Sequence, residues 1–420
     1  MHGAGVRSRR WVGAASRASF VAFVLVAGAS CGAPASSSFV PSGQTPESVD
    51  TIVAYLGSPA FRRSELERSL VSTSNGYARR RLASYTESAW GALPEWNPSV
   101  APARFVGAPA DEAYVSLTIP ATRSETELLE LGRRAFVSYP LQLADYAEKA
   151  LTRADAVTRY GLYEHEGQVG GLVRAKLADG SVHLALTCAT CHAKPEAGRL
   201  VLGKTNDDLR IDLLDADASG SAPEPWGRGR VDVTADGVQN PTAITDLRPV
   251  RFQVNLHRAG TLRNGLVPLA IRIETLAITS LGETGRPPRE VALGLALYVR
   301  SFGTALRAPS SLQSEGARLF EGQCGRCHGG ADLTGPAVPF EDVETDAAIL
   351  LGPERTTGRA RVPSLRGVAL RSPLLSSGAV RTLDELLLPR AQRPRGGHTF
   401  GQDLGPTERE KLLAWLRALD

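Results

Sequence analysis

Two copies of one five-residue motif constrain this chain more than any other feature of its sequence. Cys188-Ala-Thr-Cys191-His192 and Cys324-Gly-Arg-Cys327-His328 are both complete C-x-x-C-H sequences, the pattern typical of c-type haem attachment. Two thiols at this spacing can add to the two vinyl groups of one porphyrin, and the following imidazole can bind the iron. An isolated motif could also be half of a zinc site or a thioredoxin-like redox pair. Because both motifs are complete and use four of the five cysteines, we expect two covalently bound haem c groups, with His192 and His328 as proximal iron ligands.

Length and composition are those of an ordinary globular protein. The 420 residues are enough for two or three domains, and 42% hydrophobic with 22% charged residues is close to the average. A net charge of +4 is small for this length and does not indicate a nucleic-acid partner. No stretch reaches the roughly 20 apolar residues that a membrane-spanning helix needs. The expected partner is a redox protein, whose role as donor or acceptor the sequence leaves open.

The N-terminus resembles a bacterial export signal. Positive charges lie in residues 7–10, apolar residues follow over 18–29, and small residues then precede Cys31. We predict a lipoprotein-type signal peptide over residues 1–31, with Cys31 as the lipidation site. The chain would then contact a membrane only through that anchor, in the periplasm or on the outer cell surface. Ordinary cleavage beside Cys31, without lipidation, is the alternative.

The rest of the chain divides into a flexible tether over residues 32–50 and two domains. The tether is rich in Ser, Pro, Ala and Gly. A linker-like Ala-Pro-Ser-Ser sequence separates an N-terminal haem domain, 51–308, from a C-terminal domain, 309–420. In the first domain, apolar runs on either side of Asp179-Gly180 predict a small β-hairpin that leads to the first haem motif. The fold class that we predict is mainly α, with long loops and this hairpin in the first domain.

Sequence patterns also predict where helices begin. Capping boxes, in which Ser or Thr is followed three positions later by Glu, occur at Ser64, Ser124, Thr382 and Thr407. Helical periodicity extends over residues 266–281 and 288–302, and a further helix leads into Cys324.

From Leu312 onward the chain resembles the cytochrome c domain of the bacterial di-haem cytochrome c peroxidase and MauG superfamily. The segments that carry the resemblance are Gly316-x-x-Leu319-Phe320 before the second motif, residues 362–370, residues 372–380, and a final helix with Leu412, Leu413, Trp415 and Leu416. In the first domain, Trp226-Gly-Arg-Gly-Arg230 resembles a Gly-x-Gly-Arg-x-Asp stretch of peroxidase-like relatives. The resemblance implies two cytochrome c-like haem domains.

Two departures from the family bear on function. The family usually has a His-Asp pair where this chain has Ser376-Ser377, and it often supplies methionine as the distal ligand of the C-terminal haem. The only methionine here is Met1, which belongs to the signal peptide. Methionine ligation is therefore excluded in the mature protein, and a haem with two histidine ligands would have a lower reduction potential than its family counterpart.

The remaining histidines supply the candidate distal ligands. His398 lies in a Gly-rich stretch before the terminal helix, where c-type domains commonly present this ligand, so we predict that it binds the second iron. For the first iron we predict His257 as distal ligand or distal-pocket residue, with an open iron as the alternative.

Three further side chains are candidates for cofactor binding or catalysis. Arg228 and Arg230 could each bind a haem propionate, because a guanidinium matches a carboxylate in two hydrogen bonds; a solvated loop pair is the alternative. Glu274 interrupts an apolar helical run together with Arg272. It could move a proton in peroxide chemistry, or form a structural ion pair.

These observations favour an exported di-haem c-type cytochrome that transfers electrons. An enzyme that reduces hydrogen peroxide, as a di-haem cytochrome c peroxidase or MauG-like oxidase, is the first alternative. A haem-based sensor or binding module is the second. The three differ in whether one iron has a vacant coordination position.

Overall fold

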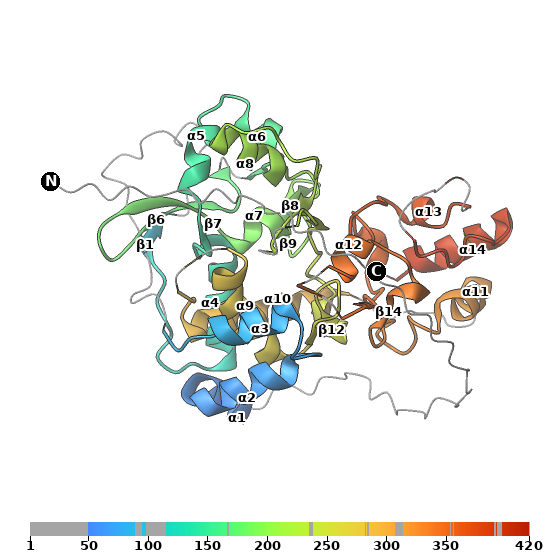
Figure 1. Ribbon diagram of the computed structural model, residues 1–420, viewed down its shortest axis with the longest axis horizontal. Coiled ribbons are helices and arrows are strands. Elements are labelled where there is room, and N and C mark those ends of the chain that lie inside the picture. Colours follow the sequence, from blue (N-terminus) through green and yellow to red (C-terminus); the bar gives the residue numbers. More distant parts are fainter. Residues whose placement is uncertain are drawn as a thin grey trace, which may run out of the picture. The chain divides into compact units, whose positions relative to one another are not determined.

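The computed structural model (Figure 1) describes residues 49–88, 95–97, 115–165, 168–234, 238–281, 283, 285–306, 314–352, 354–355, 357–389, 392 and 397–419. The predicted signal peptide, Cys31 and nearly all of the tether lie outside these residues, as does the predicted domain boundary at 308. In the part of the chain that is described, no helix is long and apolar enough to cross a membrane.

Helices from distant parts of the sequence form the first core. They are α1 (Val49–Gly57), α2 (Pro59–Ser69), α3 (Gly76–Ser84), α4 (Glu125–Ser138), α9 (Leu266–Thr279) and α10 (Arg289–Ser301). Helix α10 packs against α4 and α9, and α2 and α3 cover α9 (Figure 1). The α4–α10 crossing depends on glycine, because a Cβ on Gly132 would lie 1.8 Å from the carbonyl oxygen of Gly294. The helices predicted over 266–281 and 288–302 are confirmed as α9 and α10.

The predicted hairpin is confirmed as β6 (Leu172–Lys176) and β7 (Val182–Leu186), but it is part of a larger sheet. Strands β1 (Glu95–Asn97), β2 (Val115–Ser116) and β3 (Gln142–Leu143) extend it to five antiparallel strands in the order β2-β1-β6-β7-β3. These added strands are two or three residues long, so a sequence pattern of alternating burial is too short to identify them.

Short elements connect the sheet and the helices. They are the 3₁₀ turn η2 (Asp145–Ala147), α5 (Glu148–Leu151), α6 (Ala156–Tyr160), β4 (Glu164–His165), β5 (Gln168–Val169), α7 (Cys188–His192), β8 (Ala193–Glu196), β9 (Arg199–Leu202), α8 (Ile211–Ser219), β10 (Arg230–Val231), β11 (Thr242–Ala243), η3 (Val250–Phe252), β12 (Asn255–Leu256), β13 (Leu262–Arg263) and η4 (Phe302–Ala305). The two-stranded pairs are β4–β5, β8–β9, β10–β11 and β12–β13.

The C-terminal part has its own small core. Its elements are α11 (Glu315–Cys324), β14 (Val338–Pro339), η5 (Phe340–Asp342), α12 (Ala347–Leu350), β15 (Arg359–Ala360), η6 (Val368–Leu370), α13 (Leu383–Leu386) and α14 (Pro406–Arg417). Helix α11 packs against α14, with the rings of Phe320 and Trp415 4.4 Å apart. The helix predicted to lead into the second motif is confirmed as α11.

Two of the four predicted capping boxes are wrong in position. Ser124 caps α4 and Thr382 caps α13, as predicted. Ser64 instead lies inside α2, which begins at Pro59 after the cap residue Ser58. Likewise α14 begins at Pro406, so Thr407 is a helical residue. In both cases a proline at the first helical position starts the helix earlier, because its fixed φ suits that position.

Candidate haem-binding sites

The hairpin β6–β7 positions the first motif, which forms the single helical turn α7. Thr190 Oγ1 and Thr187 N both donate to the carbonyl of Gly171, at 2.7 and 2.9 Å. Gly171 has a φ of +79°, and a Cβ there would lie 2.1 Å from Thr190 N, so this approach requires glycine. Cys188 and Cys191 are free thiols, and burial raises the pKa of each to about 12. The turn thus holds two uncharged thiols at the spacing that haem attachment needs.

The second motif begins at the last residue of α11. Cys327 N and His328 N both donate to the carbonyl of Cys324, at 3.1 and 2.9 Å. The motif therefore continues the helix as a tight turn, and His328 is buried beneath it.

Both proximal histidines are held in the same way. His192 Nδ1 donates to the carbonyl of Thr245 at 2.9 Å. His328 Nδ1 donates to the carbonyl of Leu333 at 3.3 Å. Burial lowers the pKa of His192 to about 4 and that of His328 to about 3. A neutral imidazole that donates from Nδ1 keeps the lone pair of Nε2 for a metal, so both rings fit the role of iron ligand.

Thr245 and Pro363 are equivalent positions of an internal repeat. Residue 245 corresponds to residue 363, and residue 264 to residue 382, a constant shift of 118 positions. At this shift η3 coincides with η6, and the pairing of Leu256 with Leu262 coincides with the bridge between Leu374 and Val380.

Backbone conformation follows the same shift. His257 and Leu375 have φ values of +64° and +66°, and Gly260 and Gly378 have +58° and +68°. In each copy the glycine N–H donates to the carbonyl three residues earlier. A weak sequence signal accompanies the repeat, Leu-Arg-x-Val at 247–250 and at 365–368. The sequence analysis did not use this signal, which lies at different distances from the two haem motifs.

The two copies of the repeat contact each other reciprocally. Arg361 N donates to the carbonyl of Arg258 at 2.8 Å, and Ala243 N donates to the carbonyl of Ser376 at 2.9 Å. Replacing each residue of one hydrogen bond by its equivalent in the other copy, 118 positions away, gives the other hydrogen bond. These hydrogen bonds therefore relate the two copies by an approximate two-fold axis.

A second pair of contacts between the two copies is related by the same shift of 118 positions. Arg248 Nη2 donates to the carbonyl of Leu370 at 2.9 Å. In return, the guanidinium of Arg366 lies 4.3 Å from the ring centre of Phe252, which corresponds to Leu370.

A cavity opens beside the second motif. Cys324, His328 and His398 line it together with seven leucines, which are Leu365, Leu374, Leu375, Leu383, Leu386, Leu387 and Leu416. Its volume is about 150 Å³. We call it the second cavity.

His328 and His398 face each other at a distance that suits one metal ion. Their ring centres are 6.4 Å apart. An imidazole nitrogen bonds a first-row metal at about 2.0 Å and the ring centre lies roughly 1.1 Å further out, so opposite ligands of one ion have ring centres about 6 Å apart. The separation of the two rings therefore fits an iron held between them.

Three arginines with no ion-pair partner also line the second cavity. Arg361 donates to Gln253 Oε1 at 2.8 Å, Arg371 to the carbonyl of Ser364 at 2.8 Å, and Arg258 to that of Ala243 at 3.0 Å. None of them forms an ion pair with a described carboxylate, and burial lowers the pKa of Arg258 and of Arg371 to about 10. An uncompensated guanidinium inside a protein is costly, and the two propionates of a haem would supply the missing negative charge. The sequence analysis missed these side chains.

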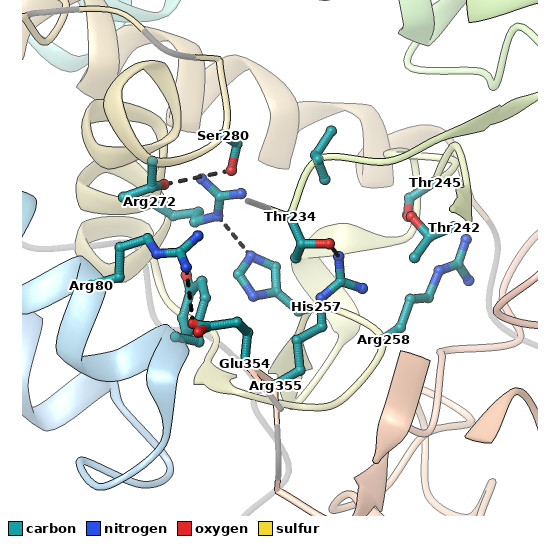
Figure 2. A pocket seen from close by; sticks show the side chains of 13 residues that line it. Arg80, Thr234, Thr242, Thr245, His257, Arg258, Arg272, Ser280, Glu354 and Arg355 are labelled. Carbon is teal, nitrogen blue, oxygen red and sulfur yellow. Dashed lines mark hydrogen bonds and ion pairs between the residues drawn. The ribbon is translucent and has the colours of Figure 1, made fainter. Parts of the chain in front are cut away.

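A further cavity, the first cavity, lies on the N-terminal copy of the repeat (Figure 2). Thr242, Thr245, His257 and Arg258 line it, and the positions 118 residues later line the second cavity. Thr245, whose carbonyl accepts the hydrogen bond from His192, connects this cavity to the first motif, although Cys188, Cys191 and His192 themselves are not among its lining residues. The rest of its wall is polar and includes Arg80, Arg272, Ser280, Glu354 and Arg355, and its volume is about 160 Å³.

His257 lines the first cavity, but both ring nitrogens have protein partners. Its Nδ1 lies 2.7 Å from Thr261 Oγ1, and its Nε2 accepts a hydrogen bond from Arg272 Nε at 2.7 Å. The placement agrees with a pocket residue, whereas direct binding to iron would require the bond from Arg272 to break. The ligand role of His257 stays a prediction.

The other predicted site residues lie in neither cavity. Glu274 is buried, accepts a hydrogen bond from Tyr55 Oη at 2.5 Å, and has Arg286 Nε at 3.3 Å. These contacts agree with the structural ion pair that was its alternative. The Arg228 side chain is exposed, 3.4 Å from Asp208, and Arg230 is half-buried in β10. Catalysis by Glu274 and propionate binding by Arg228 and Arg230 stay predictions.

Comparison with known proteins identifies the C-terminal part. Residues 313–420 match the family model described as cytochrome c. They form a cytochrome c domain. The match confirms the resemblance of this part to c-type cytochromes, whose haem c is covalently bound. No curated protein sequence matches the chain.

Two solved structures have a distant similarity to a larger part of the chain. One is a MauG-like protein associated with microbial copper homeostasis, with a TM-score of 0.37 and 16% identity over 80% of this chain and 95% of that chain. The other is the hydrazine synthase of Kuenenia stuttgartiensis, with a TM-score of 0.37 and 14% identity over 74% of this chain and 97% of that chain.

Proposed function

We propose that this chain is an exported cytochrome with two covalently bound haem c groups, which passes electrons between redox partner proteins. The observation that carries the proposal is that each C-x-x-C-H motif ends in a buried histidine whose Nδ1 donates to a main-chain carbonyl, that of Thr245 for His192 and that of Leu333 for His328. The haems, when bound, supply one-electron redox chemistry, and the protein holds and orients them.

Each haem site has its own attachment residues in this proposal. Cys188 and Cys191 bind the first haem and Cys324 and Cys327 the second, with His192 and His328 as proximal ligands. His398 is the distal ligand of the second iron, supported by the 6.4 Å separation of its ring centre from that of His328.

Contact between the two sites supports electron transfer. Arg258 lines both cavities, and its main chain forms one of the reciprocal hydrogen bonds between the copies of the repeat. A single side chain thus spans the protein between the two sites, which favours a short path from one haem to the other.

Export and anchoring complete the proposal. The signal-like N-terminus supports assembly outside the cytoplasm, and lipidation of Cys31 would hold the cytochrome on a membrane surface. We expect detergent partitioning of the native protein, and release by Cys31→Ser, because a bacterial lipid anchor carries several acyl chains. Recovery of unmodified protein as a free periplasmic species contradicts the anchor.

Peroxide reduction is a second candidate, which one observation favours. His257 lies at the first cavity with Arg272 bonded to its Nε2 (Figure 2), and an imidazole there could move a proton during bond cleavage. Glu274, by contrast, is tied to Tyr55 and Arg286.

The spin state of the oxidised protein separates the two functions. Electron transfer predicts two low-spin haems and no peroxide turnover above that of free haem. The enzyme predicts one high-spin haem that reacts with hydrogen peroxide and loses the reaction in His257→Leu. That substitution introduces the residue type found at the equivalent position 375, so the backbone can accommodate it. A protein mass that shows no covalent haem rejects both functions.

A further inference from the structure

The first cavity carries more positive than negative charge. Arg80, Arg258, Arg272 and Arg355 line it. Among the described residues of its wall, Glu354 alone carries a carboxylate, and Arg80 pairs with that carboxylate at 3.2 Å. Arg355 donates to the hydroxyl of Thr234 at 3.2 Å. The charges of Arg258 and Arg272 therefore remain without a compensating ion pair.

Arg272 reaches the cavity with donors to spare. Its Nε donates to His257, whereas its buried Nη1 has no hydrogen-bond partner among the described residues (Figure 2). The same is true of the buried Nε of Arg258. Such donors cost free energy unless a ligand satisfies them.

A further buried arginine, Arg81, lies behind the wall of the first cavity. Arg81 is 1% exposed, and it donates to Tyr77 Oη at 2.7 Å while its Nε and Nη2 have no partner. Tyr77 in turn packs edge-on against His257, with ring centres 5.0 Å apart. Burial and the nearby arginines, Arg272 and Arg81 first among them, lower the pKa of His257, which therefore adds no charge of its own.

The second cavity shares Arg258 and is also lined by Arg361 and Arg371, but neither His257, Arg272 nor Arg80 lines it. Positions 375 and 376, which correspond to His257 and Arg258, are leucine and serine. Arg272, Arg80 and Arg81 belong to α9 and α3, which lie outside the repeat. Most of the polar wall of the first cavity thus comes from residues outside the repeat. The second cavity can hold its haem without an equivalent wall.

We propose that the first cavity binds a small anion through Arg272 and Arg258, a carboxylate or an inorganic oxyanion of sulfate size. A volume of about 160 Å³ admits such a group, and planar guanidinium groups bind oxyanions with two hydrogen bonds each. Two sources share this chemistry, a free oxyanion and a propionate of the first haem. The proposal goes beyond electron transfer, because anion binding at these arginines needs neither haem reduction nor a redox partner.

Calorimetry on the haem-loaded full chain tests the free-anion source. We expect sodium sulfate, titrated at constant ionic strength, to bind at one saturable site, and Arg272→Met to weaken binding about tenfold or more. Arg272→Lys should keep part of the affinity, since it keeps the charge. Arg133→Met, which removes an equal charge from the exposed pair with Glu130 on α4, should bind as the native protein does. Thermal unfolding and the haem spectrum establish that each variant is folded.

Crystals of the same protein, grown without sulfate or phosphate and soaked in selenate, distinguish the sources. An anomalous selenium peak beside Arg272 supports a free oxyanion. A haem carboxylate within hydrogen-bond distance of Arg272, with no selenate bound, supports the propionate. A cavity that holds neither group, together with sulfate binding unchanged in Arg272→Met, overturns the proposal. Loss of the first haem by mass would reject the di-haem function and still leave sulfate binding measurable.

Discussion

The two cavities are built on equivalent copies of one backbone segment but have different walls. The second cavity is lined by seven leucines, by Arg258, Arg361 and Arg371, and by His398, whose ring centre is 6.4 Å from that of His328. The first cavity is lined by arginines, threonines and His257. The shared part, residues 244–264 and 362–382, supplies the proximal side of each site. The differences come from helices α3 and α9 in one half and from the loop around His398 in the other.

The comparison separates what holds a haem from what decides its chemistry. Residues 257 and 375 have the same positive φ, so the scaffold imposes one backbone conformation and leaves the side chain free to differ. Leucine at 375 contributes to an apolar cavity, and histidine at 257 provides an anchor for Arg272. Apolar, enclosed surroundings favour a stable haem with two protein ligands, whereas a polar wall favours a bound anion or a proton transfer.

Removing one pair of thiols at a time should have the largest effect. We expect Cys188→Ser with Cys191→Ser, and separately Cys324→Ser with Cys327→Ser, each to reduce the mass of the denatured protein by one haem. The second pair should lower the unfolding temperature more, because it leaves a cavity lined mainly by apolar residues empty. Intact-mass spectrometry and calorimetry measure both effects. An unchanged mass in either variant means that its motif carries no haem.

Substituting the two candidate distal histidines should separate the sites spectroscopically. His398→Ala should convert one ferric haem from low to high spin, because the ring opposite His328 is then missing. His257→Ala should convert the other haem, because two low-spin haems require a distal ligand at the first iron and His257 is the one predicted. Electron paramagnetic resonance of the oxidised protein measures both effects. Unchanged spin states in the His257 variant would mean that His257 is not a ligand, in agreement with its bonds to Thr261 and Arg272.

An arginine of the second cavity should affect the potential more modestly. Arg371→Met removes a cation that lines the cavity and should make the midpoint potential of the second haem more negative, because the ferric form loses a repulsion. An interaction of about 1.4 kcal/mol corresponds to about 59 mV for one electron. Potentiometric titration measures the shift. Arg133→Met, which alters the surface charge equally, is the control, and equal shifts in both variants would argue against a propionate contact at Arg371.

Local sequence patterns were sufficient to predict the elements whose structure depends mainly on nearby residues. The haem motifs, the hairpin around Asp179-Gly180, and helices α4, α9, α10 and α11 all follow from spacing, caps and periodicity over fewer than about twenty residues. The placement of His398 near His328 also follows from its position before the last helix. In each case the residues that decide the structure are neighbours in the sequence.

Features assembled from distant segments were not predictable in this way. Arg258, Arg361 and Arg371 meet at one cavity although a hundred residues separate the first from the second. Glu274 and Arg272 are two residues apart on α9, so they point to different sides of the helix. Their surroundings differ because α1 packs against one side of α9, at Glu274, and the first cavity lies on the other, at Arg272. Strand β1 depends on pairing with β6, about eighty residues later, and β2 depends on pairing with β1.

Helix-cap substitutions should have the smallest effect and test whether the two halves unfold together. Ser124→Ala removes the cap of α4 in the first core, and Ser314→Ala removes that of α11 in the second; each should cost about 1 kcal/mol. The reciprocal hydrogen bonds of Arg361 with Arg258 and of Ala243 with Ser376 connect the halves, so we expect one transition that both variants shift. Calorimetry measures this on the haem-loaded protein. Two transitions, each sensitive to only one substitution, would mean that the halves fold independently and that the contact between the repeats contributes little to stability.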